Sequence, residues 1–287
     1  MSFYIVAAAA ALALGGGYAT DSQQQLAPGA ASAASPGLTY ADAADLAVGA
    51  PIAAHVRVVR ASALRARDAQ GVTPGHRRFL VTADVVSLIR APGALPPRVT
   101  WLVDLPNDSR GRAARLSKRT ELLVVATPVE GRPGELRLAA PDAQLPYSAP
   151  LAERLRAIHR ELAGGSPPPR ITAVGRAFHV PGAIPGESET QIFLQTADGR
   201  PVSLSILRRP GEQPRWAVSL AEFVDENAAA PRQDTLLWYR LACTLPRALP
   251  APSMAAASPE ERRAIEADYR LVLQGLGPCT RTRQRPR

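Results

Sequence analysis

The segment RFLVTADVVSLI, residues 78–89, carries the clearest strand pattern in the chain. Its apolar side chains fall on one face of an extended segment: Phe79, Val81, Ala83 and Val85. Thr82 and Asp84 fall on the other face, as the two-residue period of a β-strand requires. The pattern therefore predicts a strand with one buried face.

Segments of similar composition flank this strand, and breaks that contain Gly or Pro separate them. They cover residues 52–64, 98–105, 119–129 and 135–140. Five strands in fewer than 100 residues favour a small antiparallel β-barrel, and the strand count alone suggests an OB-like one. A helix should follow over 148–163, with Ser148 as its N-cap and Gly164 at its end. We expect residues 40–163 to form this β-barrel-like domain with its terminal helix.

The segment GGSPPPR, residues 164–170, predicts a Pro-rich linker. Beyond it, residues 171–280 predict an α+β domain with a four-stranded antiparallel sheet and two helices. Its strands should cover 171–180, 190–197, 201–209 and 215–224, and its helices should begin near Asp234 and at Ser258. The chain as a whole is thus expected to be a β-rich two-domain protein.

The N-terminal segment MSFYIVAAAAALALGGGYA, residues 1–19, resembles a signal peptide. Its apolar run is too short to span a bilayer, and Ala19 offers a small residue for cleavage. Because no Lys or Arg precedes the run, an uncleaved anchor or a misplaced start codon stays open as an alternative. Residues 20–39 are rich in Ala, Ser, Gly and Gln and predict a disordered leader. We therefore expect a periplasmic or secreted bacterial protein.

The only two cysteines, Cys243 and Cys279, lie at the ends of the two predicted C-terminal helices. In an exported chain this placement predicts a structural disulfide that holds the second helix against the first. Two reduced, unrelated thiols are the alternative. Neither cysteine has another ligand at metal-binding spacing, so we expect no metal site and no cofactor.

Positive charge is concentrated in the first predicted domain and in the tail. Residues 40–163 carry 18 basic and 12 acidic side chains, whereas residues 164–280 carry 12 of each. A basic tail follows at 281–287, for which we expect disorder. Five cations cluster in one connection between strands and are the candidate binding residues: Arg110, Arg112, Arg115, Lys118 and Arg119. They indicate contact with an anionic surface or polymer, or else form an ordinary solvated loop. Few aromatic residues accompany them, which disfavours nucleic acid.

Familiar catalytic motifs are absent from the sequence, including the GxSxG elbow, HExxH and the P-loop. The most unusual segment is FHVPGAIPGESETQ, residues 178–191, which contains two Pro-Gly pairs. It brings four side chains with acid–base or nucleophilic potential into one loop: His179, Glu187, Ser188 and Glu189. We favour an ordinary ordered connection over an acid–base or metal site. Asp84 and Asp104 would form a carboxylate pair only if their strands bring them together.

These observations lead to three hypotheses of function. The first is a non-catalytic binding or scaffolding module of the cell envelope, with an envelope protein or an anionic surface as its partner. The second is a hydrolase that uses the 178–191 loop. The third is a binder of anionic polymers or lipid headgroups through the 110–119 loop.

Overall fold

The computed structural model describes residues 37–112, 115–220 and 228–283 of the chain. The predicted signal peptide at 1–19 lies outside these residues, as does the leader except for its last three positions. Residues 113–114 of the basic connection and 221–224 of the last predicted strand also lie outside them.

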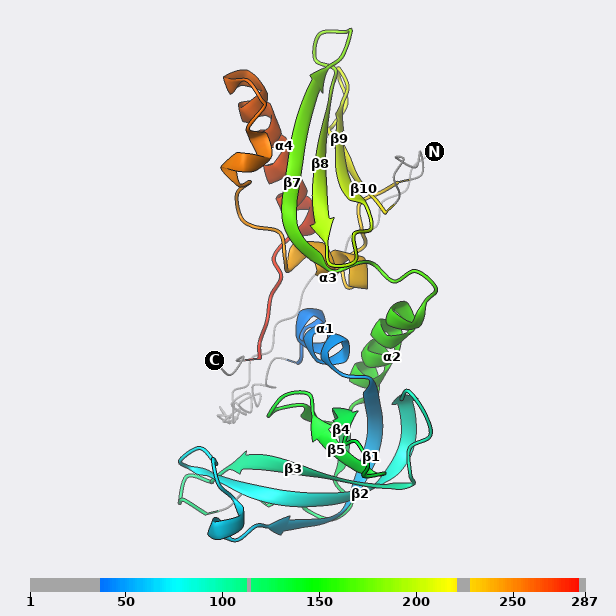
Figure 1. Cartoon of the computed structure of the whole chain (residues 1–287), viewed down its shortest axis with the longest axis vertical. Helices are drawn as coiled ribbons and strands as arrows, with labels where there is room; N and C mark the ends of the chain where they lie inside the picture. The colour runs from blue at the N-terminus through cyan, green and yellow to red at the C-terminus, as the bar shows by residue number, and fades with distance from the viewer. Residues whose placement is uncertain (1–36, 113–114, 221–227, 284–287) are drawn as a thin grey trace, which may run out of the picture. The chain divides into compact units, whose positions relative to one another are not determined.

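Six strands form the first sheet (Figure 1). They are β1 (Ile52–Ala63), β2 (His76–Arg90), β3 (Arg98–Pro106), β4 (Glu121–Pro128), β5 (Glu135–Leu138) and β6 (Gln144–Pro146). The first five follow the order β1-β2-β3-β5-β4, and pairing of β1 with β4 closes them into a five-stranded barrel, with β6 added to β4. Only β3 and β5 pair in parallel. The five predicted strands and the β-barrel are confirmed. The parallel pair β3–β5 corrects the expectation of a wholly antiparallel barrel, and β6 was not expected.

The barrel interior is filled by the alternating apolar residues of its strands. In β2, Phe79, Val81 and Ala83 are buried, as the period of two predicts. At the centre of β3, Trp101 is 2% exposed, and its indole Nε1 donates a 2.8 Å hydrogen bond to Gln144 at the start of β6. Such a partner lets a large aromatic side chain be buried without leaving its N–H unsatisfied.

Two helices flank the barrel in sequence, α1 (Tyr40–Gly49) and α2 (Ala149–Ala163). A short 3₁₀ turn, η1 (Ala66–Asp68), lies between β1 and β2. The prediction for α2 is confirmed, because Ser148 accepts a hydrogen bond from the Leu151 amide as its N-cap. The helix α1 was not predicted. It begins with a capping box in which Thr39 and Asp42 bond reciprocally.

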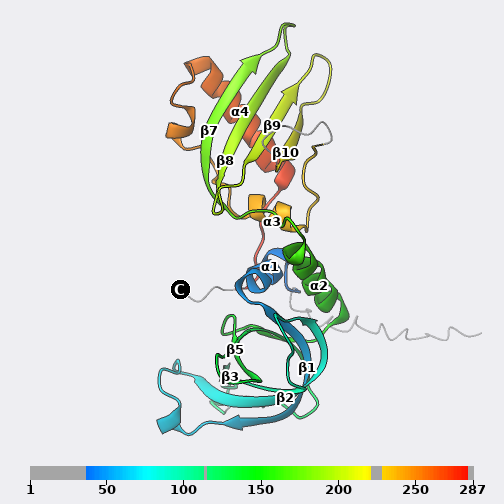
Figure 2. The ribbon, with the colours of Figure 1, turned by 45° about the vertical axis from the view of Figure 1, so that its right-hand side comes forward.

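The second sheet has the antiparallel order β10-β9-β8-β7 (Figure 2). Its strands are β7 (Ile171–Pro181), β8 (Ser188–Thr196), β9 (Val202–Arg208) and β10 (Arg215–Ser219). They are followed by α3 (Leu236–Ala242), the 3₁₀ turn η2 (Ala251–Met254) and α4 (Pro259–Leu276). Helix α4 packs against β7 and β8, and its predicted apolar stripe is buried: Ile265, Tyr269, Val272 and Leu276. The four-stranded sheet with helices is therefore confirmed.

One apolar cluster contains residues from both sides of the predicted linker. Leu46 of α1, Leu155 of α2 and Tyr269 of α4 all belong to it. The contacts within Gly37–Arg287 group these residues as one unit. The division at 164–170 into two domains therefore stays a prediction.

The predicted disulfide between Cys243 and Cys279 is present. It ties the end of α3 to the segment after α4. The first three residues of the basic tail depart from the expected disorder, because Arg281, Thr282 and Arg283 bind acidic side chains. The rest of the tail, residues 284–287, lies outside the described residues. We call residues 281–283 the C-terminal strap. None of the helices in the described parts of the chain has both the length and the apolar character needed to cross a membrane.

Candidate functional site: the basic end of the barrel

The five predicted binding cations lie at one end of the barrel. There, the β1–β2 loop (residues 64–75) and the β3–β4 loop (residues 107–120) lie side by side, joined by a 2.7 Å hydrogen bond from the Asn107 amide to the Gly75 carbonyl. Together the two loops contain seven basic and two acidic residues. We call them the basic end. Their proximity depends on the pairing of β2 with β3, which local sequence patterns do not show.

The β3–β4 loop is anchored near both of its ends. The Asp108 carboxylate accepts hydrogen bonds from the amides of Arg112 and Arg110, and these bonds hold its pKa below the usual value. At the other end, the Arg119 amide donates to the Val58 carbonyl of β1 over 2.8 Å. The strand framework therefore fixes where the loop's cations emerge.

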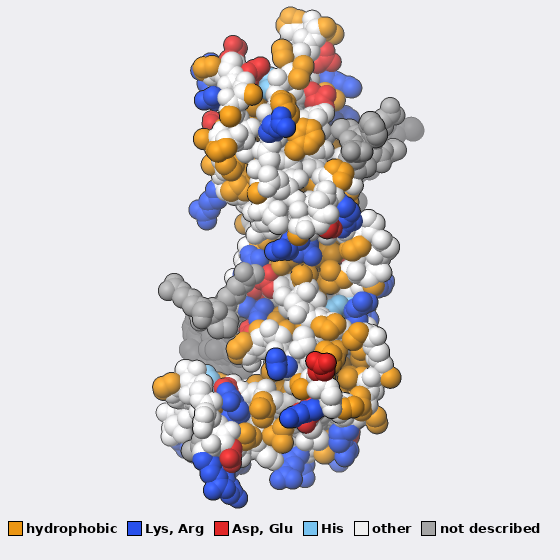
Figure 3. Space-filling model, in the orientation of Figure 1, with side chains coloured by type: hydrophobic (Ala, Val, Ile, Leu, Met, Phe, Trp, Pro, Cys, Tyr) orange, Lys and Arg blue, Asp and Glu red, His pale blue; other side chains and the backbone are white. Residues whose placement is uncertain are grey.

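Most cations of the basic end are exposed and have no carboxylate partner. Arg112 pairs with Asp108, and Arg67 pairs with Asp68. Within the described residues, no acidic side chain pairs with the remaining five: Arg65, Arg110, Arg115, Lys118 and Arg119. Figure 3 shows basic side chains gathered along the lower edge of the barrel. This surface is able to attract an anion at little desolvation cost, because its charges stay in contact with water.

His179, the predicted acid–base residue, belongs to a different group of side chains from the one expected. It lies on β7 opposite Thr190 of β8, and its Nδ1 is 2.8 Å from the Thr190 hydroxyl. That hydroxyl donates to the carboxylate of Asp268 on α4, which also accepts a 2.7 Å hydrogen bond from Arg208. Thr190 and Asp268 are buried. Because the hydroxyl proton goes to Asp268, Thr190 accepts from Nδ1–H, and the Nε2 of a neutral His179 ring carries the lone pair.

Thr190, Asp268 and Arg208 were not among the predicted site residues. One signal was available for Asp268, which interrupts the buried stripe of α4 immediately before Tyr269. A carboxylate at such a position needs hydrogen-bonding partners from the facing sheet.

The other residues of the 178–191 loop do not join His179. Glu189 lies on the opposite face of the sheet, where it accepts a hydrogen bond from Gln191. Glu187 packs so closely against Gly182 that a side chain at position 182 would clash with it. Ser188 shares the face of His179 and is half-buried. The four predicted residues therefore do not form one site.

The hypothetical carboxylate pair is also absent, because each aspartate pairs with an arginine of its own. Asp84 accepts a 2.8 Å hydrogen bond from Arg98, and Asp104 is bound through both oxygens by Arg78. These hydrogen bonds hold the pKa values of both carboxyl groups below their usual range. Both aspartates therefore stay ionised at neutral pH and unsuited to acid–base work.

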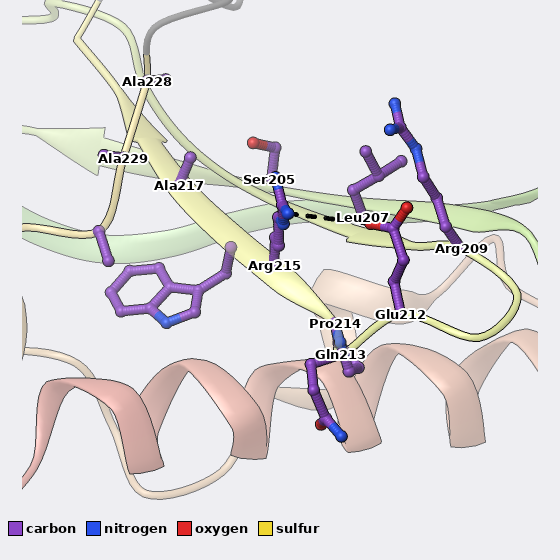
Figure 4. A pocket seen from close by; sticks show the side chains of 12 residues that line it. Ser205, Leu207, Arg209, Glu212, Gln213, Pro214, Arg215, Ala217, Ala228 and Ala229 are labelled. Atoms are coloured by element: carbon purple, nitrogen blue, oxygen red, sulfur yellow. Dashed lines mark ion pairs between the residues drawn. The ribbon is translucent and has the colours of Figure 1, made fainter.

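A hollow of about 560 Å³ lies on the second sheet, along β9, β10 and residues 228–230 (Figure 4). Glu212 and Arg215 form a loose 4.0 Å ion pair at its rim. No converging set of polar groups accompanies this pair, so the hollow does not suggest a particular chemistry.

Comparison with known proteins adds no family to this description. No model of a known protein family matches the chain, and no characterised protein is significantly similar to it in sequence. Within the residues that the structure describes, no three His, Cys, Asp or Glu side chains converge as metal ligands would. The candidate sites must therefore be argued from their own chemistry.

Proposed function

We propose that the protein is a non-catalytic binding module of the bacterial cell envelope that holds an anionic partner at the basic end of its barrel. The proposal rests mainly on one observation: the two adjoining loops together contain seven basic residues and only two acidic ones. A strand framework that presents charged loops favours binding, because the loops keep their positions without a partner.

Two features support a location outside the cytoplasm. The chain begins with a segment of signal-peptide character, and its cysteines form a disulfide. Structural disulfides persist in the periplasm and in secreted proteins, whereas cytosolic thiols are kept reduced. In the envelope, the available polyanions are lipid headgroups and acidic glycans, and nucleic acid is scarce.

The strand order supports an OB-like assignment for the barrel. A five-stranded Greek-key barrel closed between β1 and β4 fits that architecture, whose β1–β2 loop often contributes to ligand binding. Here that loop is half of the basic end. The assignment is an analogy of fold, so the binding role rests on the charges themselves.

A pull-down from envelope extract at low and high salt tests the proposal, with an affinity tag inserted in the 20–39 leader. The test variant changes Arg110, Arg115 and Lys118 to Gln. Arg112 and Arg119 are left unchanged so that the loop keeps its conformation. Arg112 pairs with Asp108, and the backbone of Arg119 has a positive φ of 66°. The matched control changes three exposed cations of the second sheet and α4 to Gln: Arg176, Arg263 and Arg270.

We expect the wild type and the control to retain an anionic partner at low salt and to release it at high salt, since screening weakens contacts between exposed charges. The test variant should retain much less of it. A partner that the test variant keeps at wild-type levels would show that the basic end is not the binding surface.

The arrangement around His179 favours a second function, a hydrolase. Through Thr190, the buried Asp268 orients the imidazole so that Nε2 is available as a general base, as a carboxylate does in hydrolytic triads. Screening with chromogenic esters and phosphate esters tests this function. Activity in the wild type that falls at least a hundredfold in His179→Ala, but not in Arg263→Gln, would support it. Equal activity in both variants would exclude His179 as the base.

A further inference from the structure

A cavity of about 670 Å³ with basic residues in its lining lies between α2 and the end of β2. Its polar lining consists of Arg90, Glu153, Arg156, His159 and Arg160. We call it the arginine pocket. It is separate from the basic end, because Arg90 is the last residue of β2 whereas the basic end adjoins the first, His76.

The charges around the arginine pocket do not balance. Glu153 is paired with Arg156. Neither Arg90 nor Arg160 has a carboxylate partner within the described residues, so the pocket carries two uncompensated positive charges. Arg90 is also only partly exposed. Like charges gathered around a concave surface repel one another and create a field that favours an anion of charge −2.

His159 adds an unsatisfied polar atom to the same lining. Its side chain is buried, with 3% exposed, and its Nε2 has no hydrogen-bond partner among the described residues. A buried polar atom without a partner costs free energy, so it requires an explanation. A bound anion would supply the missing acceptor for an Nε2–H group after a small rotation of the ring.

The rest of the lining is apolar and is formed by Leu88, Ile89, Ala91 and Ala163. A cavity of this volume lies within the range that small organic ligands occupy. Arginine forks recognise the oxygens of phosphate in a bidentate manner. We propose that the arginine pocket binds a phosphate monoester, with the dianion between Arg90 and Arg160 and the organic group against Leu88 and Ala163.

Two sources in the envelope would supply this chemistry. One is a soluble organic phosphate, and the other is a lipid whose headgroup is a phosphate monoester. Phosphodiester lipids carry a single negative charge on the phosphate and match the two arginines less well. The experiment therefore has one arm for each source.

In the first arm, isothermal titration calorimetry measures the binding of butyl phosphate and of inorganic phosphate to the disulfide-bonded protein at neutral pH and low salt. In the second, sedimentation measures binding to phosphatidylcholine vesicles with and without phosphatidic acid. The test variant is Arg160→Gln, which replaces an exposed side chain and leaves the buried core unchanged. Arg263→Gln on α4 is the matched control.

We expect butyl phosphate to bind more tightly than inorganic phosphate, and Arg160→Gln to weaken its binding at least tenfold, as the loss of a charge-assisted hydrogen bond requires. The control should bind as the wild type does. Binding to phosphatidic acid vesicles that depends on Arg160 would identify the lipid source. No binding of any phosphate monoester in either arm, or equal affinity in Arg160→Gln and Arg263→Gln, would overturn the proposal.

Discussion

Three buried ionisable side chains in this protein are accommodated in different ways. Asp42 accepts hydrogen bonds from Thr39, Thr282 and the Arg283 amide, and these bonds lower its pKa despite the opposing effect of burial. Asp268 is bound by Thr190 and Arg208. His159 instead stays neutral. Asp42 keeps a charge that its partners stabilise, whereas His159 avoids one.

The neutral state of His159 predicts a pH dependence of stability. Burial, reinforced by the nearby Arg90, lowers its pKa from 6.5 to about 4. As pH falls, the unfolded chain therefore takes up a proton before the native protein does. The native state should lose about 2–3 kcal/mol of stability between about pH 7.5 and about pH 4.5 from this group alone.

Urea denaturation of the wild type and of His159→Gln at both pH values measures this contribution. The variant should lack that part of the acid-induced loss, while the carboxylates contribute equally in both proteins. If both proteins lose the same free energy, His159 titrates normally in the native state.

At the scale of elements, strands and helix caps were predictable where the local signal and the tertiary fold agree. The strand over 78–89 and the capping box of Ser258 and Glu261 are examples. Helix α1 was missed. It has only ten residues, its Ala-rich sequence adjoins the leader, and its buried Asp42 depends on donors about 240 residues away. Similarly, the group around His179 combines two strands with a distant helix, so its spacing along the chain carried no signal.

The disulfide between the end of α3 and the segment after α4 should contribute strongly to stability. It closes a loop with a sequence separation of 36 residues. Replacing both cysteines, Cys243→Ala with Cys279→Ala, should lower the free energy of unfolding by roughly 3–4 kcal/mol, because the unfolded chain gains conformational entropy. Chemical denaturation of the oxidised wild type and the double variant checks the value. A difference near zero would mean that strain in the bonded state cancels the gain.

At the scale of the molecule, contacts distant in sequence link the predicted parts. The hydroxyl of Tyr239 in α3 donates to Asp45 of α1, and Leu236 of α3 is bound through its amide by Glu161 of α2. A Pro-rich segment is a reasonable sign of a boundary. It does not reveal whether helices on its two sides pack together, because that depends on tertiary contacts that composition does not encode.

The C-terminal strap should be required for full stability. Truncation after Thr280 removes donors to the buried Asp42 carboxylate and the arginine partner of Asp45. The loss should be about 2–4 kcal/mol, as expected when a buried carboxylate loses its partners. Thermal denaturation measures it, with truncation after Arg283 as the control that keeps these contacts. Equal melting temperatures would show that water replaces the strap.

The hydrogen bond between Asp42 and Thr282 joins two residues that are synthesised far apart in time. Ribosomes add roughly 5–20 residues each second, so the 240 residues between these positions take roughly 12–48 s to synthesise. Throughout that interval, the Asp42 carboxylate has its donor Thr39 but lacks the donors from Thr282 and Arg283. The native surroundings of α1 are therefore completed only after the last residues of the chain have been made.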